Sequence, residues 1–184
     1  KQNNYKIRFL TKEEEKALFE TMGKNKDYHY FIPIVICALQ TGMRKGEILN
    51  LKWSNIDFEN KYIELLKTKS GKARKIPISS KLMDELLKLK KNIICEYVFA
   101  NPYTKTKYIS IHKGFGEVLK KAKIEKFRFH DLRHTAATRM TEMGIDLAVV
   151  QEILGHSDVK TTMRYAHPVP ERKLKAIEAL NNYI

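Results

Sequence analysis

The strongest constraint on this chain is a run of short helical segments between residues 129 and 167, separated by glycines. One helix is predicted over 130–143, where Gly144 ends it, and a second over 147–154, where Gly155 ends it. A third, short helix follows, with Ser157 or Asp158 as its cap. The run therefore forms one short helical block.

Four side chains with phosphate chemistry fall within this block: His130, Arg133, His156 and Tyr165. His130 and Arg133 are three residues apart, so they share a helix face. His156 occupies the glycine turn between two helices, and the third helix carries Tyr165. Two histidines, an arginine and a tyrosine suit attack of a tyrosine on a phosphodiester.

Such an attack makes several chemical demands. The phenol must lose its proton, the transition-state oxygens need fixed positive donors, and the 5′ oxygen leaves badly unless an acid protonates it. Arginine grips two phosphate oxygens and stays charged, and histidine moves protons near neutral pH. A lysine on a mobile tip can protonate the leaving oxygen. The block itself lacks a second arginine and that acid.

The second arginine is found far upstream. Arg44 follows a helix stop at Gly42 and precedes a short helix that carries Glu47. The start of a helix offers outward-facing amides, which makes it a good place to hold a phosphate. An exposed loop arginine without a ligand is the alternative reading of this position.

A small antiparallel sheet is predicted from strands at 56–58, 62–65 and 74–78, with Pro77 on an edge strand. The turn before the last strand is strongly basic, and a flexible basic tip suits insertion near a DNA backbone. The alternative is a charged turn that prevents edge pairing. The residues concerned are Lys67, Lys69, Lys72 and, at the start of the strand, Arg74.

The rest of the chain is predicted to be mainly helical. A capping box of Thr11 and Glu14 starts a helix to about Met22, and a core helix runs from about Asp27 to Leu39. Further helices are expected from Ser79 or Ser80 to about Lys91, with Leu82, Leu86, Leu87 and Leu89 largely inward, and from Ser110 to about Lys123. Lys105 and Lys107 make another basic loop. The expected fold class is α+β, a mainly α-helical single domain with a small antiparallel sheet.

Charge favours a polyanionic partner. The 184 residues contain 35 Lys and Arg against 21 Asp and Glu, which gives a formal net charge of +14 and a pI near 9.7. An excess of this size most often accompanies nucleic-acid binding, although a solvated basic surface is the alternative.

The two cysteines indicate a reducing compartment, and the apolar runs are too short for a membrane span. Cys37 and Cys95 lie in apolar contexts without metal-ligand spacing, so they are interpreted as small buried hydrophobes. The expected location is the cytoplasm of a bacterial cell or a phage-infected host. The longest apolar run, 31–39, is half of what a membrane span needs and contains Pro33.

A zinc site is the main alternative for the histidines. His130 and His134 have the spacing of a His-x-x-x-His pair. However, Asp131 replaces the glutamate of the zinc-protease motif, Arg133 would place a cation beside the metal, and no third ligand is apparent. We therefore expect no metal.

Five segments together resemble the tyrosine recombinases, in order and in approximate spacing. The resemblance covers nearly the whole chain and is to the catalytic domain of a phage-integrase-type enzyme, and it implies that fold. The segments are Thr41–Glu47, Thr68–Ile78, His130–His134, Leu154–Ser157 and Tyr165–His167.

The resemblance assigns the proton chemistry. It makes Tyr165 the nucleophile that forms a 3′-phosphotyrosyl link, and Lys69 the general acid for the 5′ hydroxyl. Lys67 and Lys72 are neighbours that can be confused with Lys69. His130 corresponds to the acid/base histidine. No metal or nucleotide cofactor is implied, because the phosphotyrosine conserves the bond energy for rejoining.

The resemblance also assigns the phosphate clamp. Arg44 and Arg133 would grip the phosphate, His156 would hydrogen-bond it, and Glu47 would support Arg44. Weaker candidates for contacts to double-stranded DNA are Lys67, Lys72, Arg74, Lys105 and Lys107.

The expected organisation is a linker remnant over 1–10, a catalytic domain over 11–167 and a tail helix over 168–184. The tail carries an apolar stripe of Leu174, Ile177 and Leu180. This stripe either packs on its own domain or, as the resemblance implies, docks on a neighbouring protomer of a homotetramer on DNA.

The predicted function is site-specific DNA recombination, the integration or excision of a phage or mobile element. A type IB topoisomerase would use the same chemistry to relax supercoils as a monomer. A DNA-binding module without catalysis is the alternative from another class.

Overall fold

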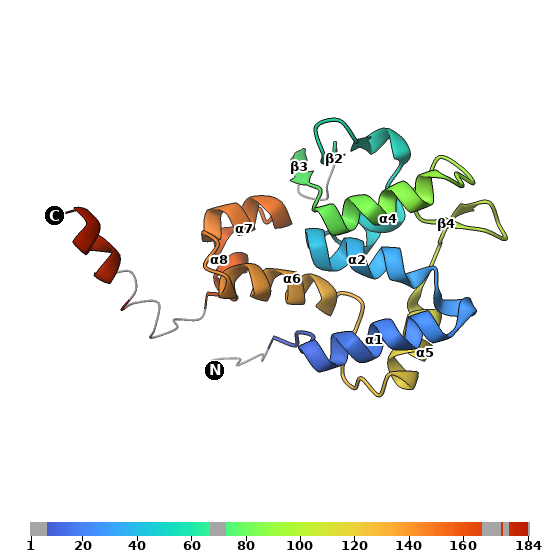
Figure 1. Ribbon diagram of the computed structural model, residues 1–184, viewed down its shortest axis with the longest axis horizontal. Coiled ribbons are helices and arrows are strands. Elements are labelled where there is room, and N and C mark those ends of the chain that lie inside the picture. The colour runs from blue at the N-terminus through green and yellow to red at the C-terminus, as the bar shows by residue number, and fades with distance from the viewer. Residues whose placement is uncertain (1–6, 67–72, 167–173, 175–176, 184) are drawn as a thin grey trace.

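The structure is a computed structural model that describes residues 7–66, 73–166, 174 and 177–183 (Figure 1). Its α-helices are α1 Lys12–Lys24, α2 Phe31–Thr41, α3 Lys45–Leu49, α4 Ser80–Lys90, α5 His112–Lys121, α6 Asp131–Glu142, α7 Leu147–Leu154 and α8 Val159–Met163. Short 3-10 helices are η1 Lys26–Tyr28, η2 Trp53–Asn55 and η3 Leu180–Tyr183.

The strands form two small antiparallel sheets. One has the order β1 Ile56–Asp57, β2 Tyr62–Leu65 and β3 Arg74–Pro77, and the other pairs β4 Ala100–Asn101 with β5 Thr106–Lys107. Pro77 lies opposite Tyr62 on the edge strand β3, as expected for a residue that cannot donate a ladder hydrogen bond. The predicted α+β class, mainly helical with a small antiparallel sheet, is confirmed.

Helix α2 is the centre of the core. It packs against α1, α3, α4 and α6, and Figure 1 shows it between α4 and α6. Because it is covered on several sides, it is apolar nearly all round rather than on one stripe. Its buried apolar residues are Phe31, Ile34, Val35, Ile36, Cys37, Ala38 and Leu39. In the part of the chain that the structure describes, no helix has the length and hydropathy to cross a bilayer.

The start of α2 differs from the predicted one. The segment after Asp27 forms η1, and α2 begins at Phe31 rather than at Asp27. Pro33 explains why the helix can start there. It falls in the first turn, where a missing amide removes no intrahelical hydrogen bond.

The residues just before α1 contact the helical domain. The capping box of Thr11 and Glu14 is present, and it starts α1 as expected. However, Leu10 is fully buried, and its amide donates a hydrogen bond to the Thr135 hydroxyl on α6 over 2.9 Å. Arg8 forms an ion pair with Glu14. These contacts attach residues 8–10 to the domain, so they are not part of a loose linker.

Three smaller predictions are wrong. Leu87 is exposed, whereas Leu82 and Leu86 are buried in the core. Cys95 is only half-buried, while Cys37 is buried as expected and burial raises its thiol pKa to about 12. Tyr165 lies just beyond the end of α8 rather than on it, although Asp158 caps that helix.

Gly42 sets the geometry of the turn between α2 and α3. It ends α2 with φ of 62°, and its carbonyl accepts a hydrogen bond of 2.8 Å from Arg133. A Cβ at this position would lie 2.5 Å from a methyl carbon of Leu154. Both the backbone angle and the packing therefore require glycine.

Gly42→Ala should lower the free energy of unfolding by about 2–4 kcal/mol, since left-handed backbone strain and overpacking add. Urea unfolding monitored by circular dichroism measures this loss. Gly116→Ala in α5 is the matched control, because nothing lies within 4 Å of the added Cβ. It should stabilise the domain by roughly 0.5–1 kcal/mol. Equal stability of the two variants would contradict the packing argument at Gly42.

Candidate active site

The predicted site residues that the structure describes come from three parts of the chain. Arg44 is the N-cap of α3, immediately after the turn at Gly42. Arg133 lies on α6, and His156 and Tyr165 flank α8. The end of α7 and strand β3 close the arrangement, since α7 packs against both α6 and β3.

Glu47 binds two arginines at once. Its carboxylate accepts from the Arg44 backbone amide at 2.8 Å and from the Arg44 guanidinium at 3.1 Å. It also accepts two hydrogen bonds from Arg74, of 3.1 and 2.8 Å. Burial raises the pKa of this carboxyl, but the hydrogen bonds and charges of the two arginines outweigh that effect and hold the pKa below its ordinary value. Glu47 therefore stays charged and fixes Arg44.

Arg74 begins strand β3, as predicted, and its side chain points into the protein. Its side chain is 6% exposed, and its Nε donates to the Ile153 carbonyl over 3.0 Å while both terminal nitrogens bind Glu47. This geometry does not suit a contact to DNA. Arg74 instead links β3, α3 and the end of α7.

Gly155 makes room for this link. It ends α7 with φ of 67°, and an added Cβ would lie 2.6 Å from the Arg74 guanidinium. Its carbonyl accepts a hydrogen bond of 3.1 Å from Arg44. The close approach of both arginines therefore depends on this glycine.

Arg133 is buried, and one nitrogen of its guanidinium has no hydrogen-bond partner among the described residues. Nη1 donates to the Gly42 carbonyl, whereas Nη2 is buried without a hydrogen-bond partner among the described residues. Burial first, and then the charges of Arg44 and Arg74, lower the Arg133 pKa to about 10, against an opposing effect of Glu47. A buried cationic donor without a partner is costly in free energy, so this group is suited to an anion that arrives from outside.

His156 is a neutral imidazole at physiological pH. Burial, followed by the charges of Arg133 and Arg44, lowers its pKa to about 4. Its Nδ1 lies 2.8 Å from the Thr162 hydroxyl. A hydroxyl that donates to Nδ1 leaves the ring proton on Nε2, where it can be donated to a ligand.

Tyr165 is buried, with 3% of its surface exposed, in a small cluster with Ala137, Val150 and Leu154. Its hydroxyl lies 2.6 Å from Nδ1 of His134. Burial raises the pKa of the phenol, while the charges of Arg133 and Arg164 act in the opposite direction. The phenol therefore holds its proton near neutral pH.

The three histidines of the block that the structure describes make different contacts. His130 is the N-cap of α6 and meets the His134 ring edge to face, with ring centroids 4.9 Å apart. Desolvation by the surrounding protein, and then the charge of Arg133, lowers the His130 pKa. The His156 ring lies parallel to Tyr165 at 6.5 Å. In the described part of the chain no three His, Cys, Asp or Glu residues form a possible metal site.

Sequence reasoning missed two members of this arrangement. His134 was considered only as half of a zinc pair, and Arg74 only as a DNA contact. The sequence around His134 does not indicate its contact with Tyr165, because the two residues are 31 positions apart in the chain. The alternation of buried and exposed positions in β3 was a usable signal for Arg74, because residues 74 and 76 point to the same face.

The predicted acid, Lys69, and its neighbours Lys67 and Lys72 lie outside the described residues. Lys105 is exposed in the turn between β4 and β5. Lys107 hydrogen-bonds the Asn50 side chain at the end of α3 and lies over the Tyr97 ring. That contact places Lys107 near the segment that carries Glu47.

The family of this chain follows from a comparison with known protein families. The model of the phage integrase family matches residues 8–172, which is most of the chain. This chain belongs to the phage integrase family.

Relatives and solved structures agree with the family. The chain is 35% identical over 182 residues to the tyrosine recombinase XerA of Pyrococcus furiosus, covering 94% of this chain and 61% of that protein. The catalytic domain of bacteriophage HP1 integrase is 30% identical, with a TM-score of 0.71 and 94% of each chain covered. The Tn1549 transposon integrase in complex with transposon right end DNA has a TM-score of 0.85. At 22% identity, over 97% of this chain and 67% of that one, it shows the same fold.

This phage integrase family chain thus spans about 60% of the length of the XerA recombinase that it matches. Its match to the HP1 protein is to a catalytic domain alone, over nearly the full length of both.

Two hollows flank the paired arginines. One, of about 700 Å³, is lined by residues of α3 and β2 and reaches Arg44 and His130. The other, of about 230 Å³, is lined by Arg74, His156 and Gln151. Arg44 and His130 thus line one hollow, and Arg74 and His156 line the other.

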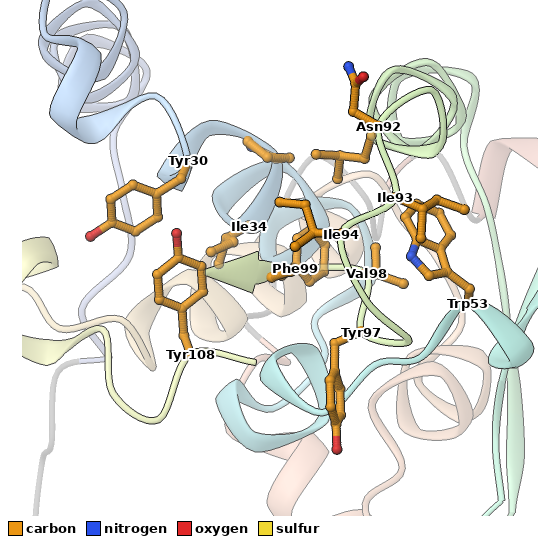
Figure 2. Close-up of a pocket in the computed structure, with 13 residues that line it drawn as sticks. Tyr30, Ile34, Trp53, Asn92, Ile93, Ile94, Tyr97, Val98, Phe99 and Tyr108 are labelled. Atoms are coloured by element: carbon orange, nitrogen blue, oxygen red, sulfur yellow. The ribbon is translucent and has the colours of Figure 1, made fainter. Parts of the chain in front are cut away.

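A third hollow lies away from these residues (Figure 2). It is small, about 70 Å³, and its lining is mainly aromatic and aliphatic. Figure 2 shows the rings of Tyr30 and Tyr108 near each other, and they stack with centroids 4.9 Å apart. Its lining includes no histidine, lysine, arginine or carboxylate.

Arg74→Ala should lower the free energy of unfolding by about 3 kcal/mol, because the buried Glu47 carboxylate loses a partner. Urea unfolding at neutral pH measures this loss. The free energy of unfolding of Arg74→Lys should lie between those of the unaltered protein and Arg74→Ala. Lysine keeps the positive charge but cannot make the bidentate hydrogen bonds of arginine. Lys75→Ala is the matched control on the same strand, where an exposed lysine pairs with Glu64. Similar stability of the Arg74→Ala and Lys75→Ala variants would show that the link does not hold the site together.

Proposed function

We propose that this chain is the catalytic part of a site-specific DNA recombinase that cuts and rejoins DNA through a 3′-phosphotyrosyl link. The observation that carries the proposal is the buried, unpartnered Nη2 of Arg133, in a cluster with Arg44 and Tyr165. Membership of the phage integrase family and the names of the relatives support the same activity. Integration or excision of a phage or mobile element is the proposed biological outcome.

The proposed mechanism begins with capture of one phosphodiester. Arg133 Nη2 and the Arg44 guanidinium grip the two non-bridging oxygens, and the neutral His156 donates from Nε2. Glu47 holds Arg44 in place. Fixed donors of this kind stabilise the charge that develops on the phosphorus oxygens in the transition state.

Tyr165 then attacks the phosphorus, and the bond to the 5′ oxygen breaks. Lys69 is proposed to protonate that oxygen, and His130 to exchange protons at the same site. Rejoining is the reverse reaction with a 5′ hydroxyl from a second strand. The nucleophile and the leaving group swap roles, so no cofactor is required.

The charge of the chain supports double-stranded DNA as the substrate. Lys67, Lys72, Lys105 and Lys107 are the proposed backbone contacts. We place the catalytic domain at residues 8–167 and a tail at 168–184. We also propose that the protein acts in the cytoplasm, where the host DNA lies.

The tail is proposed to act between protomers of a homotetramer on DNA. The side chains of Leu174, Ile177 and Leu180 are exposed by 62%, 66% and 54%. Apolar side chains that are exposed to this extent on one short segment favour a partner surface over packing on the same domain.

Tyr165→Phe should abolish covalent capture of DNA while leaving DNA affinity within about twofold, since the substitution removes one hydroxyl from a buried ring. A suicide substrate, nicked so that the 5′ product is lost, traps the adduct for detection by denaturing electrophoresis. Tyr103→Phe, in the exposed turn between β4 and β5, is the matched control and should form adduct normally. An adduct with the Tyr165→Phe protein would exclude Tyr165 as the nucleophile.

Truncation after Pro168 should spare cleavage of the suicide substrate and weaken assembly on paired sites by about tenfold or more, because interface anchors of this kind contribute over 1 kcal/mol each. Multi-angle light scattering of the DNA complexes measures assembly. Replacing Leu174, Ile177 and Leu180 together by alanine should reproduce the defect, whereas Glu178→Ala should not. Normal assembly by the truncated protein would favour packing of the tail on its own domain, and supercoil relaxation by a monomer would favour a topoisomerase.

A further inference from the structure

His134 lies in direct contact with the group that must lose a proton. Its Nδ1 is 2.6 Å from the Tyr165 hydroxyl, which is a strong hydrogen bond between a ring nitrogen and a phenol. Building on the function proposed above, we infer that His134 takes the phenol proton of Tyr165 during strand cleavage and returns it during rejoining. His134 is thus a further catalytic residue.

Both partners of this hydrogen bond are held firmly. His134 lies in the first turn of α6, the helix that packs on the core helix α2. The Tyr165 ring is buried against Ala137 and Val150. Because both rings are packed in place, the phenol donates its proton toward Nδ1 whenever the imidazole carries its own proton on Nε2.

The other two histidines are less well placed to take this proton. His130 contacts the His134 ring edge to face, and its own contact is therefore with the imidazole and not with the hydroxyl. His156 lies 6.5 Å from Tyr165, centroid to centroid, and its Nδ1 is bonded to Thr162. Among the described histidines, His134 is the one whose ring nitrogen is hydrogen-bonded to the phenol oxygen.

The protonation states of the two groups suit transfer of a proton from the Tyr165 phenol to the His134 imidazole. Burial lowers the pKa of His134, so its imidazole is neutral near pH 7 and can accept a proton. Burial raises the pKa of Tyr165, so the phenol does not ionise without a base. The titratable and charged groups that act on His134 are His130, Asp131, Arg133 and Arg128, in addition to Tyr165 itself.

The step balances without any further reactant. The proton moves from the Tyr165 oxygen to Nδ1 of His134 as that oxygen bonds to phosphorus. The bond from phosphorus to the 5′ oxygen breaks, and the 5′ oxygen takes a proton from the acid, Lys69 in the proposed mechanism. In rejoining, the imidazolium returns its proton to the departing phenolate. The nearby charges of Arg133 and His130 disfavour a lasting imidazolium and so favour that return.

The test compares His134→Asn with the unaltered chain. An asparagine oxygen lies close to the position of Nδ1 and accepts a hydrogen bond, but it does not take a proton near neutral pH. Single-turnover adduct formation on the suicide substrate is measured from about pH 4.5 to about pH 9, a range that extends well below ordinary histidine titration because the pKa of His134 is lowered. DNA affinity is measured in parallel by electrophoretic mobility shift.

In the unaltered chain the rate should rise with pH and then reach a plateau once His134 is neutral. His134→Asn should reduce the rate at neutral pH by about 10²–10⁴-fold with DNA affinity unchanged, which is the usual contribution of general base catalysis. Its rate should rise over the whole pH range, because hydroxide must then take the proton. His112→Asn at the exposed start of α5 is the matched control and should behave like the unaltered chain.

A second variant, His134→Ala, distinguishes loss of the base from misfolding of the His134→Asn protein. His134→Ala leaves a space that free imidazole can enter, and added imidazole should restore adduct formation in proportion to its neutral form. Normal rate and plateau in His134→Asn, or a folded His134→Ala protein that imidazole does not rescue, would overturn the inference. An unaltered chain that forms no adduct on any DNA site would instead contradict the proposed function. The two failures are therefore distinguishable.

Discussion

The site depends on one carboxylate that is shared by two arginines. Glu47 pairs with Arg44 three residues before it and with Arg74 on strand β3, at distances between 2.8 and 3.1 Å. Arg74 in turn reaches the end of α7, and Arg44 reaches Gly155. Without Glu47, like charges would meet in a half-buried space, which is unfavourable by several kcal/mol. The carboxylate therefore allows three distant segments to approach.

The local features of the fold were predictable because they depend on neighbouring residues. The capping box at Thr11 and the glycine ends at Gly42 and Gly155 follow from backbone geometry that only certain residues satisfy. Pro77 on an edge strand follows from its missing amide. The order of motifs was sufficient to propose the catalytic residues, since the chemistry of phosphate transfer restricts the residue types.

The partners of individual side chains were not predictable in the same way. The Arg74 hydrogen bond to Ile153 joins residues 79 apart in the chain, and the Arg44 hydrogen bond to Gly155 joins residues 111 apart. Such contacts arise only when the helices and the sheet have packed. Spacing along the chain made His134 look like half of a metal site, whereas the turn after α8 brings a phenol to it. Separate tertiary contacts, to Glu47 and to the Ile153 carbonyl, make Arg74 a structural link between β3, α3 and α7.

The excess of positive charge in the site has a consequence for what the domain can bind. Arg44 and Arg74 share the Glu47 carboxylate, whereas Arg133 lies in the field of both arginines without an ion pair among the described residues. The site of the free domain therefore carries more positive than negative charge. A phosphodiester would supply an anion and complete the electrostatic balance of the interior. In this sense the substrate takes the place of an acidic residue that the chain does not encode.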